Sequence, residues 1–163
     1  MKKLLTIILT IVVIALAVWG GFLLLGREEA SEVDKIEQFS LSEEMYGQGE
    51  FREITAEELE QLIETKKSFV VVVHMVVCPA EFPVTSIAKQ LAHDDGVVIY
   101  GLMEEEFKQT ALAKTIRYLP SVALYREGEL VAYLDAESDS DLEYYKTVDG
   151  LRRWLSRYLT NSL

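Results

Sequence analysis

Residues 116–129 read Ile-Arg-Tyr-Leu-Pro-Ser-Val-Ala-Leu-Tyr-Arg-Glu-Gly-Glu, and this stretch decides the fold of the chain. Its proline, Pro120, directly precedes the apolar run Ser121–Tyr125, which has the composition of a strand. Arg126-Glu127-Gly128 separates that run from a second one at 129–134 and has the composition of a hairpin turn. The stretch therefore predicts two paired strands, the first of which directly follows a proline.

The same stretch resembles the central signature of the thioredoxin family, where Ile-Arg-x-Ile-Pro-Thr leads into an apolar strand and then Lys-x-Gly-Glu. In that family the proline is cis and lies beside a redox-active Cys-x-x-Cys. The resemblance covers residues 51–159, without a gap from Val70 to Ala92 and from Val97 to Leu130. It implies an α/β thioredoxin-like fold, with a central mixed β-sheet flanked by helices, and a cis bond before Pro120.

Local patterns predict elements in the matching order. Thr55-Ala-Glu-Glu58 is a capping box that opens a helix, and a reduced strand precedes it at 51–54. The β-branched run Phe69–Val73 suits a central strand covered on both faces. The other predictions are a helix from about Pro79 or Phe82, a strand at 97–100, a short polar helix at 104–114, strands at 121–125 and 129–134, and a helix at 148–159.

The sequence departs from the family at the redox site. Cys78, in Cys78-Pro79-Ala80-Glu81, falls on the first, nucleophilic cysteine and is the only cysteine of the chain, and Glu81 replaces the second. Val77 replaces a tryptophan, Val72 a buried aspartate and Gly101 its neighbouring lysine. A mixed disulfide at Cys78 would have no internal thiolate to release it, so a standard dithiol oxidoreductase is excluded.

Cys78 is the candidate catalytic residue if the chain has one, and two interpretations stay open. A helix starting at Pro79 would favour its thiolate, whereas a later start, with Pro83 in the first turn, would leave it less acidic. The Phe82-Pro83 pair favours the later start, and Glu81 opposes the thiolate. Cys78 is thus either an exchange thiol or a buried relic.

The resemblance also implies a groove between Cys78 and Pro120 where a protein or peptide client binds. The acidic segment 135–147 is longer than the corresponding family loop and borders that groove by resemblance. Tyrosine is enriched at interfaces, which makes two tyrosines of the segment contact candidates. The predicted substrate-binding residues are Val77, Leu119, Pro120, Tyr144 and Tyr145.

No metal or cofactor is expected. His74 and Cys78 are too few ligands for zinc, and a histidine at a strand end is better explained by a local hydrogen bond. Acids alternate along 135–143, but a calcium loop needs glycine and glutamate where Ser140 and Lys146 stand. The segment is better described as a solvated acidic loop.

The N-terminus predicts a membrane anchor. Residues 4–25 are apolar, and at ~1.5 Å per residue they are long enough to cross a bilayer. A cleaved signal peptide would have a shorter apolar core. Lys2 and Lys3 before the span, and Glu28 and Glu29 after it, place the N-terminus in the cytoplasm and the rest outside. The layout resembles the membrane-anchored bacterial members of the family.

The expected organisation is therefore a signal anchor at 1–25, an acidic juxtamembrane linker at 26–50 and a thioredoxin-like domain at 51–163. Phe39, Leu41, Met45 and Tyr46 of the linker are expected to be able to dock on the domain. The net charge of −11 would repel phosphate backbones, so nucleic-acid binding is not expected.

Three functions remain after these exclusions. The first is a redox-degenerate, membrane-tethered module that binds an extended peptide or partner by strand addition at Pro120. The second is a monothiol exchange protein, in which Cys78 forms mixed disulfides that an external thiol resolves. The third is a structural tether with no function in the groove.

Overall fold

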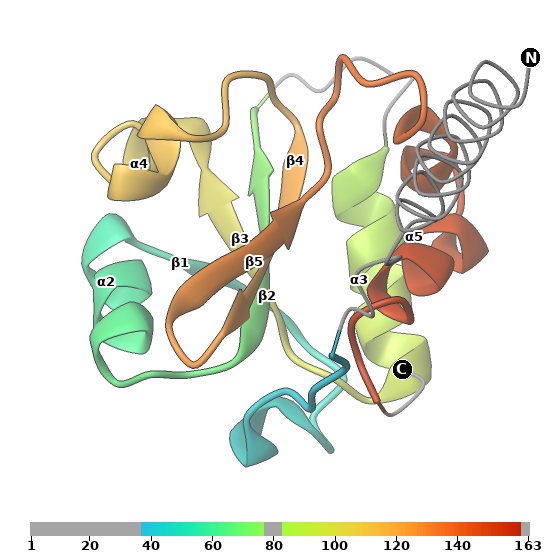
Figure 1. Ribbon diagram of the computed structural model, residues 1–163, viewed down its shortest axis with the longest axis horizontal. Coiled ribbons are helices and arrows are strands. Elements are labelled where there is room, and N and C mark those ends of the chain that lie inside the picture. The colour runs from blue at the N-terminus through green and yellow to red at the C-terminus, as the bar shows by residue number, and fades with distance from the viewer. Residues whose placement is uncertain (1–36, 77–82, 161–163) are drawn as a thin grey trace, which may run out of the picture. The chain divides into compact units, whose positions relative to one another are not determined.

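The computed structural model of the chain describes residues 37–76 and 83–160. They build a five-stranded sheet of order β1-β3-β2-β4-β5 (Figure 1). The strands are β1 (Phe51–Ile54), β2 (Phe69–His74), β3 (Ile99–Met103), β4 (Ser121–Arg126) and β5 (Glu129–Tyr133). The helices are α2 (Ala56–Glu64), α3 (Val84–Asp95), α4 (Glu104–Phe107) and α5 (Val148–Leu155), with 3-10 turns η1 (Glu43–Met45), η2 (Ala111–Lys114) and η3 (Leu142–Tyr145). The predicted α/β mixed sheet is confirmed.

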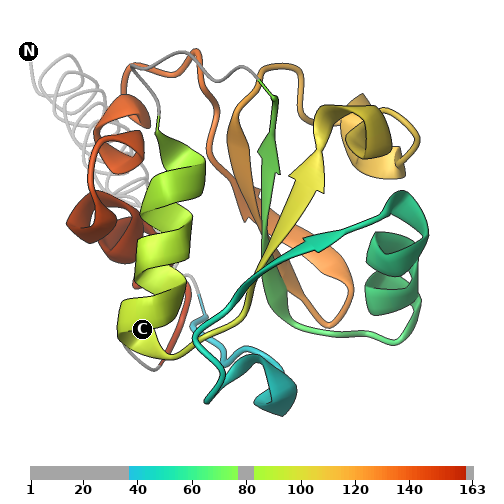
Figure 2. The ribbon, with the colours of Figure 1, turned by 180° about the vertical axis from the view of Figure 1, so that it is seen from behind.

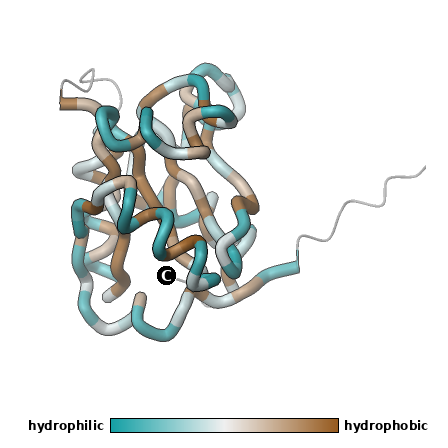
Figure 3. The backbone as a smooth tube through the Cα atoms, turned by 90° about the vertical axis from the view of Figure 1, so that its left-hand side faces the viewer, coloured by the Kyte–Doolittle hydropathy of each residue, from teal (hydrophilic) through white to brown (hydrophobic). Residues whose placement is uncertain are grey.

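Strand β2 is the centre of the sheet, as its β-branched run predicted. All six of its residues are buried. It pairs in parallel with β3 and antiparallel with β4, while β1 and β5 form the two edges. In Figure 3 the hydrophobic segments run through these inner strands and the hydrophilic ones gather at the turns.

Helices cover both faces of the sheet. Helices α3 and α5 lie on one side of the strands, and α2 and α4 lie on the other (Figures 1 and 2). Arg152 of α5 donates to both carboxylate oxygens of Asp95 at the end of α3, at 2.9 Å each, and this bidentate pair joins the two helices.

Two predicted helix starts agree with the structure. The capping box of α2 is present: the Thr55 hydroxyl accepts from the Glu58 amide at 3.2 Å, and the Glu58 carboxylate accepts from the Thr55 amide at 2.8 Å. Helix α3 begins at Val84 with Pro83 as its N-cap, close to the later of the two predicted starts, at about Phe82, which had placed Pro83 in the first turn. Pro83 therefore removes no hydrogen bond from the interior of the helix.

Residues 37–50 belong to the folded unit, which begins at Glu37 and not near Phe51. Phe39, Leu41 and Met45 are buried, so the docking expected of these side chains is observed. Phe39 also exchanges backbone hydrogen bonds with the C-terminal segment, at 2.8 Å to the Tyr158 carbonyl and 2.9 Å from the Thr160 amide. The predicted linker 26–50 thus overlaps the first part of the domain.

Three predicted boundaries differ from the structure. Strand β3 begins at Ile99 because the Val98 amide donates to the Met45 carbonyl, at 2.7 Å, outside the sheet. The helix expected at 104–114 divides into α4 and η2, because the Thr110 hydroxyl and amide both bond to the Phe107 carbonyl. Helix α5 ends at Leu155, and the chain continues to the bridge between Leu159 and Phe39.

None of the helices within 37–76 and 83–160 is long and apolar enough to cross a membrane. The predicted span 4–25 lies outside these residues.

The hairpin β4–β5 docks on α2 through Gly128. Its φ is +80°, and its amide donates to the Lys67 carbonyl at 2.8 Å. A Cβ at this position would lie 2.3 Å from the Ile63 carbonyl oxygen. Gly96, which caps α3 with φ +68°, has nothing within 4 Å of such a Cβ. The two glycines thus share a left-handed backbone and differ in the space around it.

We expect Gly128→Ala to reduce the free energy of unfolding more than Gly96→Ala does. Each substitution places a Cβ in the left-handed region, at a cost of about 1–2 kcal/mol. Only Gly128→Ala adds a clash with rigid backbone, of about 1–3 kcal/mol. Equilibrium unfolding in urea measures both variants. Equal losses would contradict the proposed docking of the hairpin on α2.

Candidate functional site

The predicted groove residues that the structure describes lie at the end of the sheet where β2 and β3 finish. The peptide bond between Leu119 and Pro120 is cis, as the family resemblance implied. Pro120 is buried and Leu119 is half-buried. The ladder pairs Val73 with Ser121, so Pro120 lies directly beyond the pair that ends β2 against β4. Val77 and Cys78 fall outside the described residues.

A hollow of about 260 Å³ opens beside Leu119. It is lined by Met75, Glu104, Phe107, Lys108, Arg117, Tyr118 and Leu119. The aromatic and aliphatic groups come from α4 and from the segments that follow β2 and precede β4. Tyr118, one of the lining residues, is 42% exposed, and Val76, which follows Met75 in the sequence, is 79% exposed. Large exposed apolar side chains beside a hollow are features of a binding surface.

The backbone of residues 117–119 has no hydrogen-bond partner in the described part of the chain. Outside the ladders and helices, no backbone hydrogen bond joins these three residues to any other residue within 37–76 and 83–160. Backbone donors and acceptors need partners, and a segment of this kind finds them in water or in an added strand. The segment that enters the cis bond therefore offers backbone groups to which an added strand could bond.

The charged side chains that line the hollow differ in whether they have an ionic partner. Glu104 and Lys108 pair with each other at 2.6 Å on α4. Arg117 is exposed and forms no ion pair with another residue of the described chain. Among the described residues that line the hollow, Arg117 is thus the one cation without an ionic partner.

Tyr145 requires a correction. Its side chain is 0% exposed, so it packs in the core and does not face a partner. Burial raises the pKa of its hydroxyl, the Asp141 and Asp135 carboxylates act in the same direction, and a hydrogen bond to Ser121 opposes them. Ser121, the residue after the cis-proline, also donates its hydroxyl to the Leu134 carbonyl at 2.7 Å. Tyr145 therefore anchors the acidic segment beside Pro120.

Tyr144 is half-buried and packs against the core, with part of its side chain accessible. In the acidic segment, Asp141 accepts from the Asp135 amide at 3.0 Å, and Asp135 accepts from the Glu137 amide at 2.9 Å. These carboxylates cap the turns of their own loop. No group of three or more metal-ligating side chains occurs in the described part of the chain.

A buried histidine forms an interaction that the sequence did not indicate. The Nε2 atom of His74 lies 3.1 Å from both carboxylate oxygens of Glu53, 21 residues earlier on β1. A carboxylate only accepts, so Nε2 carries the proton and donates. The partner is therefore on an edge strand and is not the local one predicted.

Gly101 makes this contact possible. It pairs with Glu53 on one side and with Val72 on the other, and β3 separates the two strands. A Cβ on Gly101 would lie 2.6 Å from the Phe51 ring and 2.7 Å from a Glu53 oxygen. Because Gly101 has no side chain, the Glu53 carboxylate has room to pass over β3 and reach His74. No local sequence pattern signals this contact, because it depends on the strand order β1-β3-β2.

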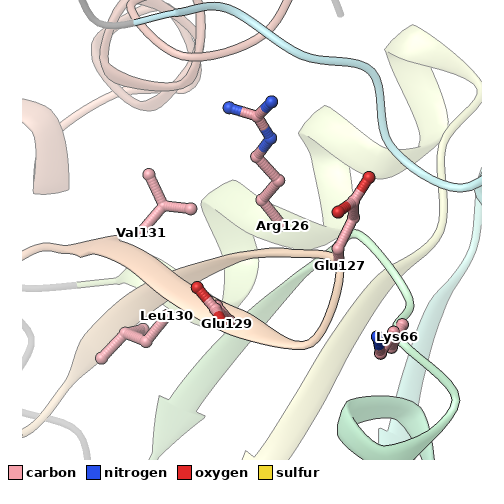
Figure 4. A pocket seen from close by; sticks show the side chains of 6 residues that line it. All are labelled: Lys66, Arg126, Glu127, Glu129, Leu130 and Val131. Atoms are coloured by element: carbon pink, nitrogen blue, oxygen red, sulfur yellow. The ribbon is translucent and has the colours of Figure 1, made fainter.

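A larger hollow, of about 510 Å³, lies at the opposite end of β4 from Pro120 (Figure 4). Lys66, Arg126, Glu127, Glu129, Leu130 and Val131 line it. Arg126 is 3.4 Å from Glu37, and its guanidinium lies over the Phe39 ring at 5.6 Å. The charges of the lining balance, and no predicted site residue is present. Its size alone does not make it the functional site.

No protein-family model and no curated protein matches the sequence. Solved structures do match the fold. A reduced thioredoxin pre-protein of Schistosoma mansoni is 18% identical, with a TM-score of 0.52 over 68% of this chain and 99% of its own. A Malassezia sympodialis thioredoxin is 14% identical, with a TM-score of 0.52 over 70% of this chain and 95% of its own.

A mutant thioredoxin from Halobacterium salinarum is 15% identical and also has a TM-score of 0.52, over 69% of this chain and 94% of its own. At such identities the likeness establishes the fold and leaves the activity open. The chain has a thioredoxin-like fold.

We expect Tyr145→Ala to destabilise the domain by about 3–5 kcal/mol, the usual cost of deleting a buried aromatic side chain. Tyr144→Ala, which deletes a half-buried ring, serves as the control and should cost clearly less. Urea unfolding of both variants measures the difference. A larger loss for Tyr144→Ala would contradict the anchoring role of Tyr145.

Glu53→Ala should reduce the free energy of unfolding by about 1–3 kcal/mol, because it leaves the buried His74 ring without its acceptor. Glu57→Ala removes an exposed carboxylate on α2 and should stay within about 0.5 kcal/mol of the parent chain. The same unfolding experiment compares them. If the two variants were equally stable, the Glu53–His74 hydrogen bond would make no net contribution to the free energy of unfolding.

Proposed function

We propose that the chain is a membrane-tethered, extracytoplasmic, thioredoxin-like protein that binds extended peptides or partner segments at the Pro120 groove. The observation that carries the proposal is that residues 117–119, beside the apolar hollow at Leu119, make no backbone hydrogen bond with any other residue of 37–76 and 83–160. Main-chain bonds give affinity in strand addition, and pockets for alternate side chains give specificity. This segment offers both at one place.

The size of the hollow favours a peptide over a small molecule. Small-molecule sites usually measure about 300–1,000 Å³ and enclose most of the ligand. At about 260 Å³, the hollow beside Leu119 falls below that range. It suits one apolar side chain projecting from an extended backbone. The exposed Val76 and Tyr118 extend the apolar contact beyond it.

The membrane anchor and its orientation are proposed on the evidence of the sequence alone. The apolar stretch 4–25 acts as an uncleaved anchor, with Lys2 and Lys3 on the cytoplasmic side. In this arrangement the folded unit works outside the cytoplasm and close to the bilayer. The single cysteine of the chain, Cys78, excludes an internal disulfide cycle.

Monothiol exchange at Cys78 is the second candidate, and the start of α3 weighs against it. The described helix begins at Val84, and Cys78 lies six positions earlier in the sequence. The dipole of a helix acts mainly within its first turn, and Cys78 precedes that turn of α3 in the sequence. The fold alone still favours a thiol at this position, because thioredoxins use one there.

Binding of short fluorescent peptides with a central leucine, measured by anisotropy with the full-length chain in detergent, tests the proposal. Tyr118→Asp should weaken binding at least about fivefold, because it places a charge against the apolar contact. Val131→Asp alters a side chain of similar exposure, 40%, at the far hollow and should leave binding unchanged.

Cys78→Ser separates the two candidates. In the proposed binding module it leaves peptide affinity unchanged. In a monothiol exchange protein it abolishes activity and removes trapped mixed disulfides. Failure of every peptide to bind, together with an inert Cys78, would leave only the structural tether.

A further inference from the structure

Opposite charges lie on the two segments that are next to β4 at its Pro120 end: the segment before Pro120, and the segment after β5, which begins beside Ser121. Before Pro120, Arg117 lines the hollow beside Leu119 and has no ionic partner among the described residues. The one carboxylate in the lining, Glu104, is paired with Lys108. The segment after β5 begins at Leu134, whose carbonyl is bonded to Ser121. That segment carries Asp135, Glu137, Asp139, Asp141 and Glu143. Pro120 lies between the two segments in the sequence.

The acidic segment is held in place. The Leu134 amide donates to the Val122 carbonyl at 2.9 Å, and the buried Tyr145 closes the segment beside Ser121. Asp135 and Asp141 are engaged in capping their own loop. Glu137 and Asp139 are exposed, and neither carboxylate forms an ion pair within residues 37–76 and 83–160. Two exposed carboxylates are therefore available on that segment.

Two effects of charge compete in the choice of ligand. The net charge of −11 attracts basic ligands from a distance. At physiological salt, however, exposed charges are screened beyond about 8 Å, so the groups in contact with the ligand decide its specificity. Arg117 contributes the opposite sign at the hollow, and a uniformly basic ligand would place a like charge against it.

We propose that the groove selects extended peptides of mixed charge: an apolar side chain enters the hollow, an acidic residue lies on the Arg117 side of it, and a basic residue lies toward Glu137 and Asp139. This inference rests on the proposed peptide-binding function and adds the chemistry of the ligand. Exposed ion pairs contribute modestly, so each charge is worth about a two- to fivefold change in affinity.

The test uses leucine-centred fluorescent peptides that differ only in their flanks: aspartate and lysine in either order, aspartate on both sides, lysine on both sides, or neutral glutamine on both sides. The full-length chain in detergent is titrated against each. We expect one mixed order to bind about two- to fivefold more tightly than the neutral peptide and more tightly than either single-sign peptide.

Variants assign each preference to its end of the groove. Arg117→Gln should remove only the gain from aspartate, and Glu137→Gln with Asp139→Asn should remove only the gain from lysine. Arg157→Gln, at an exposed position after α5, and Glu60→Gln with Glu64→Gln on α2 are the matched controls and should change neither. Each preference should also decrease when the salt concentration is raised.

The outcomes separate this inference from the proposed function. Equal binding of all flanks overturns the mixed-charge inference and leaves the peptide-binding module intact. Tightest binding of the doubly basic peptide also overturns it, because net charge would then dominate. Absence of binding by any peptide, the neutral one included, overturns both.

Discussion

The burial of β2 on both faces is the constraint on which the site depends. A run of valines has no polar face, so it is stable only in the middle of a sheet with helices on both sides. That position gives β2 two neighbours, and the antiparallel one, β4, is held in register with Val73 opposite Ser121. The register places Pro120 at the end of β2, directly after residues 117–119. The position of the proposed groove is thus a consequence of the register of the core.

The sequence predicted the features that are encoded locally. The capping box at Thr55 and the strand at Phe69–Val73 each occupy a few adjacent residues, and the cis bond at Pro120 came from a contiguous family signature. It did not predict where Val98 would pair, because its partner Met45 comes from a segment with no periodicity. Tyr145 lies in a polar loop, and only the packed structure shows that this aromatic side chain is buried.

The pair of Glu53 and His74 could not be predicted for a different reason. The two residues come from strands that are not neighbours, and the contact requires the strand order β1-β3-β2 together with the missing side chain of Gly101. With valine at position 72, the centre of the sheet has no buried acid that needs a partner. The polar contact instead lies where β2 ends, and Glu53 keeps part of its carboxylate in water. Such a placement avoids most of the desolvation cost of a buried charge.

The proposed groove also depends on small free-energy contributions. One apolar side chain in a hollow contributes about 1.5–3 kcal/mol, and each exposed charge contributes less than about 1 kcal/mol. Ordering a flexible peptide opposes these gains, so a site of this size binds weakly by itself. Weak contacts become effective when the two partners are confined together, since a tether replaces free diffusion by a high local concentration. In the proposed function a small, selective groove and an anchored chain are therefore complementary: the proposed anchor compensates for the affinity that the hollow at Leu119 is too small to provide.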